Sequence, residues 1–157
     1  DNSDNVVKIA LANKIGYLPE NKRTKCFNIL ADNADNDIKT ALAYKLDYLP
    51  ENKITEYFTI LADNADTDVK IALADNLKSF PKNIRAECFK VLADNADNDI
   101  KTALINNLYR LPENEMVECF KKLADNADND IKTVLSKHLY YIPENGRDEC
   151  LKLCKSQ

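Results

Sequence analysis

Glycine is scarce in this chain, with two glycines among 157 residues. Hairpin-rich β folds and phosphate-cradling loops both depend on glycine at tight turns, so its scarcity argues against both. Tryptophan is absent, and His138 is the only histidine. No serine or cysteine nucleophile is matched to His138, so a nucleophile–histidine–carboxylate triad is not expected.

An excess of basic residues is also missing. The formal net charge is -4 and the isoelectric point is about 5.1, whereas non-specific affinity for nucleic acid needs a basic face. No apolar run approaches the ~18–20 residues of a membrane span. We therefore expect neither nucleic acid nor a membrane among the partners of this chain.

What the sequence does contain is a repeat. LADNADNDIKTAL occupies 30–42 and recurs unchanged at 92–104, and related copies begin at Leu61 and Leu123. The start of the chain, DNSDNVVKIAL, is a diverged copy in the same 31-residue phase. Such internal periodicity is typical of arrays in which each copy buries its apolar face against the next. We predict a single repeat domain (1–157) of five repeats: 1–31, 32–62, 63–93, 94–124 and 125–157.

Each repeat is predicted to contain two helices. In repeat 2, apolar residues follow helical spacing from Ile38 to Leu49, with Asp35 placed to cap the helix start and Pro50 to end it. A second helical pattern begins at Pro50 and is broken by Asp63. Each helix would have roughly 12 residues and a length of ~18 Å. The short connections predict antiparallel neighbours.

The first helical pattern of each repeat resembles a helix of the HEAT repeat. That motif has Asp, two residues, Val and Arg, and here Asp35, Ile38 and Lys39 stand at these places. The 31-residue length is similar to the short HEAT-like repeats of the phycobilisome-lyase type. The resemblance implies an all-α fold, a right-handed, armadillo-like α-solenoid (α-α superhelix) of five two-helix repeats. Lysine cannot reproduce the forked hydrogen bonding of arginine, so the family's Asp–Arg ladder is not expected here.

The cysteines fall into columns, meaning equivalent positions of successive repeats. Stacked copies lie ~10 Å apart, too far for disulfides, whose Cα atoms must approach within ~7 Å. We therefore predict unpaired core residues. Such thiols favour a reducing compartment, which predicts an intracellular, cytoplasmic location. One column holds Cys26, Tyr57, Cys88, Cys119 and Cys150, and Cys154 stands in a leucine column.

The aspartate-rich loop DNADND is similar in composition to a calcium-binding loop, but its spacing differs. Counting from Asp32, Ala34 falls where an oxygen ligand is needed, Asp37 where glycine is needed, and Ala43 where glutamate is needed. We interpret these carboxylates as helix caps and solvated groups, and expect no metal and no cofactor. Stacking would place Asp32, Asp63, Asp94 and Asp125 along one acidic edge, which could attract a basic partner.

The column of His138 holds Lys14, Lys45, Asn76 and Asn107 and is predicted to be polar and exposed. No glycine-rich phosphate loop is found, and carboxylate pairs recur in every repeat, whereas an active site is normally singular. These features predict that the protein is not an enzyme.

Three first-helix columns vary among repeats, while the apolar columns around them do not. The variable columns are those of Tyr44, Asp47 and Tyr48, and six of the seven tyrosines lie on these helices. Tyrosine and arginine are over-represented among binding hot spots. Two interpretations stay open: a binding groove centred on repeats 2, 4 and 5, or tyrosines that only pack at helix ends. The candidate surface comprises Tyr44, Asp47, Tyr48, Asp75, Lys78, Asn106, Tyr109, Arg110, Lys137, Tyr140 and Tyr141.

The resemblance implies that this helix lines the concave side of the array. The predicted function is therefore a scaffold that binds another protein or peptide there. Two alternatives are a nucleic-acid-acting protein resembling HEAT-like DNA glycosylases, and a HEAT-like lyase or chaperone for a chromophore. We expect a monomer. Because the array begins in the middle of a repeat, a fragment of a longer array is a further hypothesis.

Overall fold

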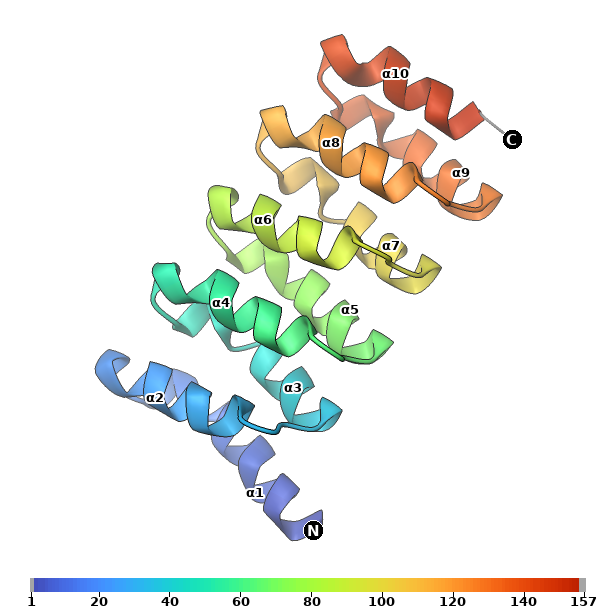
Figure 1. The fold of residues 1–157 in the computed structure, drawn as a ribbon. Coiled ribbons are helices and arrows are strands. Elements are labelled where there is room, and N and C mark those ends of the chain that lie inside the picture. The colour runs from blue at the N-terminus through green and yellow to red at the C-terminus, as the bar shows by residue number, and fades with distance from the viewer. Residues whose placement is uncertain (1, 156–157) are drawn as a thin grey trace. The chain divides into compact units, whose positions relative to one another are not determined.

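The structure is a computed structural model that describes residues 2–155, with side chains from Asp4 onward, and it is all-helical. Within these residues it shows ten α-helices, five short 3-10 turns and no strand (Figure 1). The predicted all-α class is confirmed, and the helices follow one another in a repeat-like order.

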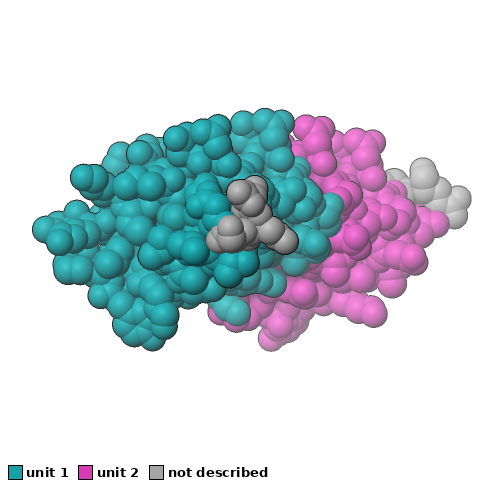
Figure 2. Space-filling view, turned by 90° about the horizontal axis from the view of Figure 1, so that it is seen from below, with its two compact units in different colours: residues 1–80 teal, residues 81–157 magenta. Residues whose placement is uncertain are grey.

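The described residues divide into two compact units, 1–80 and 81–157 (Figure 2). The boundary falls at Phe80 and Pro81, inside the third sequence repeat. Unit 1 contains α1 (Asn2–Asn13), η1 (Ile15–Tyr17), α2 (Glu20–Ala31), α3 (Asn36–Ala43), η2 (Leu46–Tyr48), α4 (Glu51–Ala62), α5 (Thr67–Asn76) and η3 (Leu77–Ser79). Unit 2 contains α6 (Lys82–Ala93), α7 (Asn98–Ile105), η4 (Leu108–Arg110), α8 (Glu113–Ala124), α9 (Asn129–His138), η5 (Leu139–Tyr141) and α10 (Glu144–Lys155).

Aspartate caps start the first helices of repeats 2 to 5, as the sequence predicts. The Asp35 Oδ1 atom accepts a hydrogen bond from the Ile38 backbone N at 3.0 Å. This bond satisfies one of the backbone N–H groups that a helix start leaves open and contributes about 1 kcal/mol. Asp66, Asp97 and Asp128 make the same bond.

Asparagine takes the place of glycine where the second helices end. Asp63 is extended after α4, and Asn64 adopts a positive φ of 49°. Asparagine tolerates this left-handed conformation better than other residues with a side chain, which allows the chain to turn sharply with almost no glycine. Asn33, Asn95 and Asn126 do the same.

The first helices of repeats 2 to 5 are shorter than the apolar spacing predicts. In repeat 2 the α-helix ends at Ala43, and Leu46–Tyr48 forms a 3-10 turn in which the Leu49 N donates to the Leu46 O at 3.0 Å. Residues three apart eclipse each other in a 3-10 turn, so Leu46 and Leu49 both reach the core. The same spacing therefore fits either helix type, and the prediction of one continuous helix to Leu49 was wrong.

Helices pack in two layers within each unit. In unit 1, α1 packs on α3, α3 packs on α5, and α2 lies beside α4 (Figure 1). In unit 2, α6 and α10 both pack on α8, and α7 packs on α9. Aromatic pairs join helices in the unit 1 core, where the ring centroids of Phe27 and Tyr57 lie 4.9 Å apart. No described helix is long and apolar enough to cross a membrane.

Lysines at equivalent positions of repeats 2 and 4 link the two helices of their repeat. The Lys39 Nζ donates to the Asp63 carbonyl at 2.7 Å, and the Lys101 Nζ donates to the Asp125 carbonyl at 2.6 Å. Both acceptors follow the C-terminal end of a second helix, where the helix dipole favours a positive charge. Lys101 is only 4% exposed. Lys39 and Lys101 thus each make one hydrogen bond to a backbone carbonyl, unlike the forked bonding of an arginine.

The column of His138 differs from the prediction. Asn76 and Asn107 are buried, and His138 is half-buried. The Asn76 Nδ2 donates at 2.8 Å to the carbonyl of Ala43, the last residue of α3. A buried helix end needs a donor for its open carbonyls. The prediction of a uniformly exposed column was therefore wrong.

The cysteine column packs in the core, and none of the five cysteines forms a disulfide. Cys88, Cys119 and Cys150 are buried, and Cys26 is half-buried, as is Cys154. Burial raises the pKa of the Cys119 thiol to about 12 and that of Cys150 to about 11. The predicted packing role is confirmed for the three buried members.

Candidate functional site

The variable columns lie on the surface. Tyr140 is 82% exposed, and the other four tyrosines of the candidate surface are each 39–47% exposed. Arg110 is half-buried, and the remaining candidates are exposed: Asp47, Asp75, Lys78, Asn106 and Lys137.

In unit 1 the candidates are separate. Burial raises the pKa of Tyr44, and the charge of the Asp75 carboxylate raises it further. Tyr48 instead covers the 3-10 turn of repeat 1, where a Cβ atom on Gly16 would lie 2.8 Å from the Tyr48 ring. The structure does not bring Tyr44 and Tyr48 into a ring contact.

Arg23 links the backbone of Tyr48 to that of repeat 1. Its Nε donates to the Leu18 carbonyl at 2.9 Å, and its Nη1 and Nη2 reach the carbonyls of Tyr48 at 3.4 Å and Gly16 at 3.3 Å. The guanidinium carbon lies 5.8 Å from the centroid of the Tyr48 ring. Arg23 therefore joins the 3-10 turns of repeats 1 and 2.

In unit 2 the candidates form an aromatic cluster. The rings of Tyr109 and Tyr141 lie 5.3 Å apart, and Tyr140 meets Tyr141 edge-on at 5.5 Å. The Arg110 guanidinium lies over the Tyr109 ring, 4.7 Å from its centroid. The structure thus brings together four of the predicted residues, from η4 and η5.

A pocket of about 440 Å³ opens beside this cluster, and we call it the cationic tyrosine pocket. Arg85 lies in its wall and donates from Nη1 to the Arg110 carbonyl at 2.6 Å. Burial, followed by the charge of Arg110, lowers the pKa of Arg85. The positive charge of Arg110 thus disfavours the charged form of Arg85. The lining consists of Lys82, Arg85, Tyr109, Arg110, Leu111, Glu113, Met116 and Tyr141.

Five of the eight lining residues were not predicted from the sequence: Leu111, which follows η4, and four residues of the second helices. Lys82 and Arg85 belong to α6, and Glu113 and Met116 belong to α8. The sequence does carry one signal: the column of Arg85 alternates between arginine and a long apolar residue. It reads Arg23, Ile54, Arg85, Met116 and Arg147.

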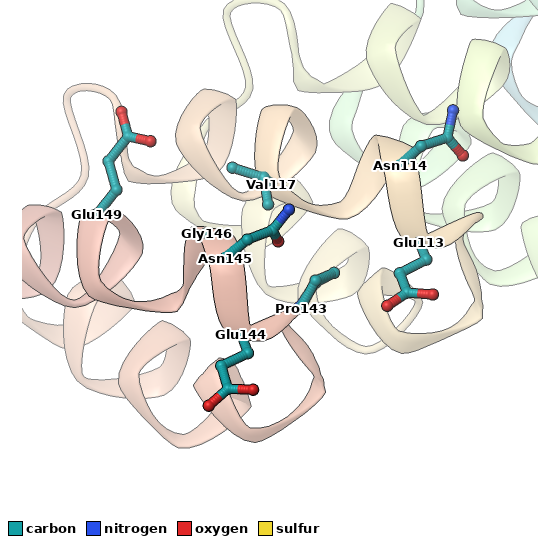
Figure 3. Close-up of a pocket in the computed structure, with 8 residues that line it drawn as sticks. All are labelled: Glu113, Asn114, Val117, Pro143, Glu144, Asn145, Gly146 and Glu149. Carbon is teal, nitrogen blue, oxygen red and sulfur yellow. The ribbon is translucent and has the colours of Figure 1, made fainter.

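A larger hollow of about 1100 Å³ in unit 2 lies where α8 and α10 begin (Figure 3). Gly146 permits the close approach of these helices, because a Cβ there would collide with Val117 Cγ2. In Figure 3 the Glu149 carboxylate points the opposite way from those of Glu113 and Glu144, and Glu149 pairs with Lys121 at 2.7 Å. The carboxylates of this hollow therefore do not converge on a common ligand position.

The acidic edge is partly used within the fold. Asp94 pairs with the Lys122 Nζ at 2.5 Å, and the Asp32 and Asp63 carboxylates accept from the amide side chains that follow them. Among residues 2–155, no group of three or more His, Cys, Asp or Glu side chains could hold a metal ion.

The cationic tyrosine pocket is therefore the strongest candidate site, since it joins predicted surface residues to charged groups from two second helices. Its chemistry is recognition of a planar or anionic group by cations and tyrosine faces. Comparison of the chain with protein-family models, curated proteins and solved structures found no significant match.

Proposed function

We propose that this chain is a protein- or peptide-binding module whose binding surface includes the cationic tyrosine pocket and the neighbouring Tyr140. The observation that carries the proposal is the cluster of Tyr109, Tyr140 and Tyr141 beside that pocket. These exposed rings stand in the columns that vary between repeats, while the columns that pack the core hold similar residues.

Tyrosine suits this role for physical reasons. Its ring offers a large contact area at a small cost in side-chain entropy, and its hydroxyl can donate or accept a hydrogen bond at the rim. An exposed cluster of rings would otherwise be a liability in water. A partner that covers the cluster would remove this apolar surface from solvent.

The HEAT-like solenoid and its concave binding face remain predictions from the repeat. No specific contact favours the glycosylase-like or chromophore-lyase alternatives. Nucleic acid is further disfavoured by the net charge of -4.

A capture experiment tests the proposal. The tagged chain and the triple variant Tyr109→Ala, Tyr140→Ala and Tyr141→Ala would be compared by affinity capture and mass spectrometry. We expect the variant to lose the captured partner, because each ring contributes about 1–2 kcal/mol or more at a hot spot.

The matched control is Ile29→Ala with Ile60→Ala, two exposed apolar residues on α2 and α4, away from the tyrosine columns. This control should retain the partner. Undiminished capture by the triple tyrosine variant, with helical content unchanged by circular dichroism, would contradict the proposal.

A further inference from the structure

The repeat supplies an internal comparison for the cationic tyrosine pocket. Every lining residue has an equivalent two repeats earlier, in unit 1. Some pairs are alike, such as Arg85 with Arg23 and Leu111 with Leu49, and others differ. In chain order, the unit 1 equivalents are Glu20, Arg23, Asp47, Tyr48, Leu49, Glu51, Ile54 and Ser79.

The charge is reversed between the two sets. The pocket in unit 2 has three cations, Lys82, Arg85 and Arg110, and one carboxylate, Glu113. The set in unit 1 has one cation and three carboxylates. The shared arginine and leucine belong to the common backbone framework, and the residues that differ set the chemistry of the surface.

Arg85 belongs to the framework. It donates to the carbonyl of Arg110, just as Arg23 donates to that of Tyr48 in unit 1. Both arginines therefore bond the backbone of the 3-10 turn that follows them, so the presence of this arginine in both units does not distinguish them. The positive character particular to unit 2 therefore comes from Lys82 and Arg110.

Lys82 and Arg110 have no ion-pair partner among the described residues. Lys90 of unit 2, in contrast, forms ion pairs with Glu115 at 2.7 Å and with Glu118 at 3.0 Å. Glu113 lines the same pocket but forms no ion pair within 4.0 Å among the described residues. The Arg110 guanidinium carbon lies 4.7 Å from the centroid of the Tyr109 ring, and a guanidinium beside a ring can still donate its N–H groups to a carboxylate.

We infer that the cationic tyrosine pocket binds an acidic segment of the protein or peptide partner, with an Asp or Glu carboxylate held by Lys82 and Arg110. This inference rests on the proposed function. An apolar or aromatic side chain next to that carboxylate packs against Tyr141 and Met116. A volume of about 440 Å³ accommodates such a pair of side chains.

A peptide rather than a nucleic acid is favoured by the surroundings. The cations occupy one pocket instead of a continuous basic stripe, and the chain as a whole is acidic. A phosphate backbone needs a row of cations, whereas a single carboxylate needs one guanidinium and one neighbour.

Binding of three labelled peptides by fluorescence anisotropy tests the inference. The peptides have equal length and equal phenylalanine content, and carry glutamate, glutamine or lysine at the remaining variable positions. We expect the glutamate peptide to bind about tenfold more tightly than the glutamine peptide, because charge-assisted hydrogen bonds are roughly twice as strong as neutral ones. Added salt should weaken it.

The decisive variant is Lys82→Glu with Arg110→Tyr. It installs the residues that unit 1 already carries at these places, Glu20 and Tyr48, and therefore suits the repeat backbone. We expect it to lose the preference for glutamate. The control, Lys152→Glu with Lys155→Gln, changes the net charge equally on the exposed residues of α10 and should bind as the native chain does.

The outcomes separate the inference from the proposed function. Equal binding of glutamine and glutamate peptides, lost on Tyr109→Ala, would overturn the acidic ligand while supporting a peptide-binding module. A glutamate preference that survives Lys82→Glu with Arg110→Tyr would overturn the pocket assignment. Tighter binding of a phosphopeptide or of DNA than of the glutamate peptide would also overturn the inference.

Discussion

Tyr48 in unit 1 and Tyr141 in unit 2 occupy the same column, and each lies on the 3-10 turn of the preceding repeat. Tyr48 rests on Gly16, with Arg23 bonded to three carbonyls beneath it. Tyr141 instead meets the ring of Tyr109, which stands in the column of Gly16. One backbone arrangement thus places a tyrosine ring over a glycine in one unit and a cluster of tilted and edge-on rings beside a cationic pocket in the other.

This difference shows that the backbone framework and the surface chemistry depend on separate columns. The caps, the leucine pairs and the lysine bonds recur in both units, so they set the backbone. Substitutions in the variable columns can then change charge and shape without disturbing the fold. Each unit also contains one glycine, and the two glycines meet different neighbours.

The largest effect is expected from filling the glycine of unit 2. A Gly146→Val substitution would drive a branched side chain into Val117, whose own χ1 is restricted in α8. We expect a loss of about 3 kcal/mol in the free energy of unfolding, measured by urea denaturation. In unit 1, Gly16→Val meets the exposed ring of Tyr48, which can swing into solvent, so the loss should be about 1 kcal/mol. Equal losses would contradict this view of the two glycines.

Moving the pocket from one unit to the other should have the next largest effect. The substitutions Glu20→Lys, Asp47→Tyr, Tyr48→Arg and Ser79→Tyr place the unit 2 chemistry on the unit 1 framework. We expect unit 1 to gain affinity for the glutamate peptide by about tenfold, because a charge-assisted contact replaces repulsion. The measurement is anisotropy in a chain whose native pocket carries Lys82→Glu and Arg110→Tyr. If the chain with these four substitutions gained no affinity, the exchanged lining residues would not be sufficient for binding the glutamate peptide.

The smallest effect is expected from alkaline pH. The Cys119 thiol has its pKa raised by burial from 9.0 to about 12. Above pH 9.0 the unfolded chain releases this proton while the folded chain keeps it, so the free energy of unfolding falls as pH rises towards about 12. The half-buried Cys26 of unit 1 has a thiol pKa that burial also raises.

Thermal midpoints between neutral pH and pH about 11 would measure this effect. Cys119→Ala should flatten the alkaline decline more than Cys26→Ala does. A steeper decline in the Cys119→Ala variant than in the native chain would contradict the assigned cause.

Much of the fold follows from local patterns. Asp35 and its equivalents were predicted as caps because a cap needs only the residues of one helical turn. The unpaired core thiols were predicted because equivalent positions of stacked copies lie too far apart for disulfides. The 3-10 turn at Leu46–Tyr48 was missed, because apolar residues three apart satisfy both helix types.

The site was predicted only in part. Exposure of Tyr109 and Tyr141 could be expected from their variable columns, whereas the burial of Asn76 could not. Asn76 is buried because the carbonyl of Ala43, far away in sequence, needs a donor. Lys82 and Met116 come from second helices, where the alternating column of Arg85 and Met116 is a signal that does not by itself reveal a pocket.

The sequence by itself determined the 31-residue period, the helical class and the division into uniform and variable columns. These properties depend on spacing along one chain segment, where helix geometry relates position to face. Only the tertiary structure decided that Tyr141 meets Tyr109, that Tyr48 covers Gly16, and that Lys82 and Arg110 line one pocket. Such contacts depend on how helices of successive repeats pack, and this packing is set by the shapes of side chains that are distant in sequence.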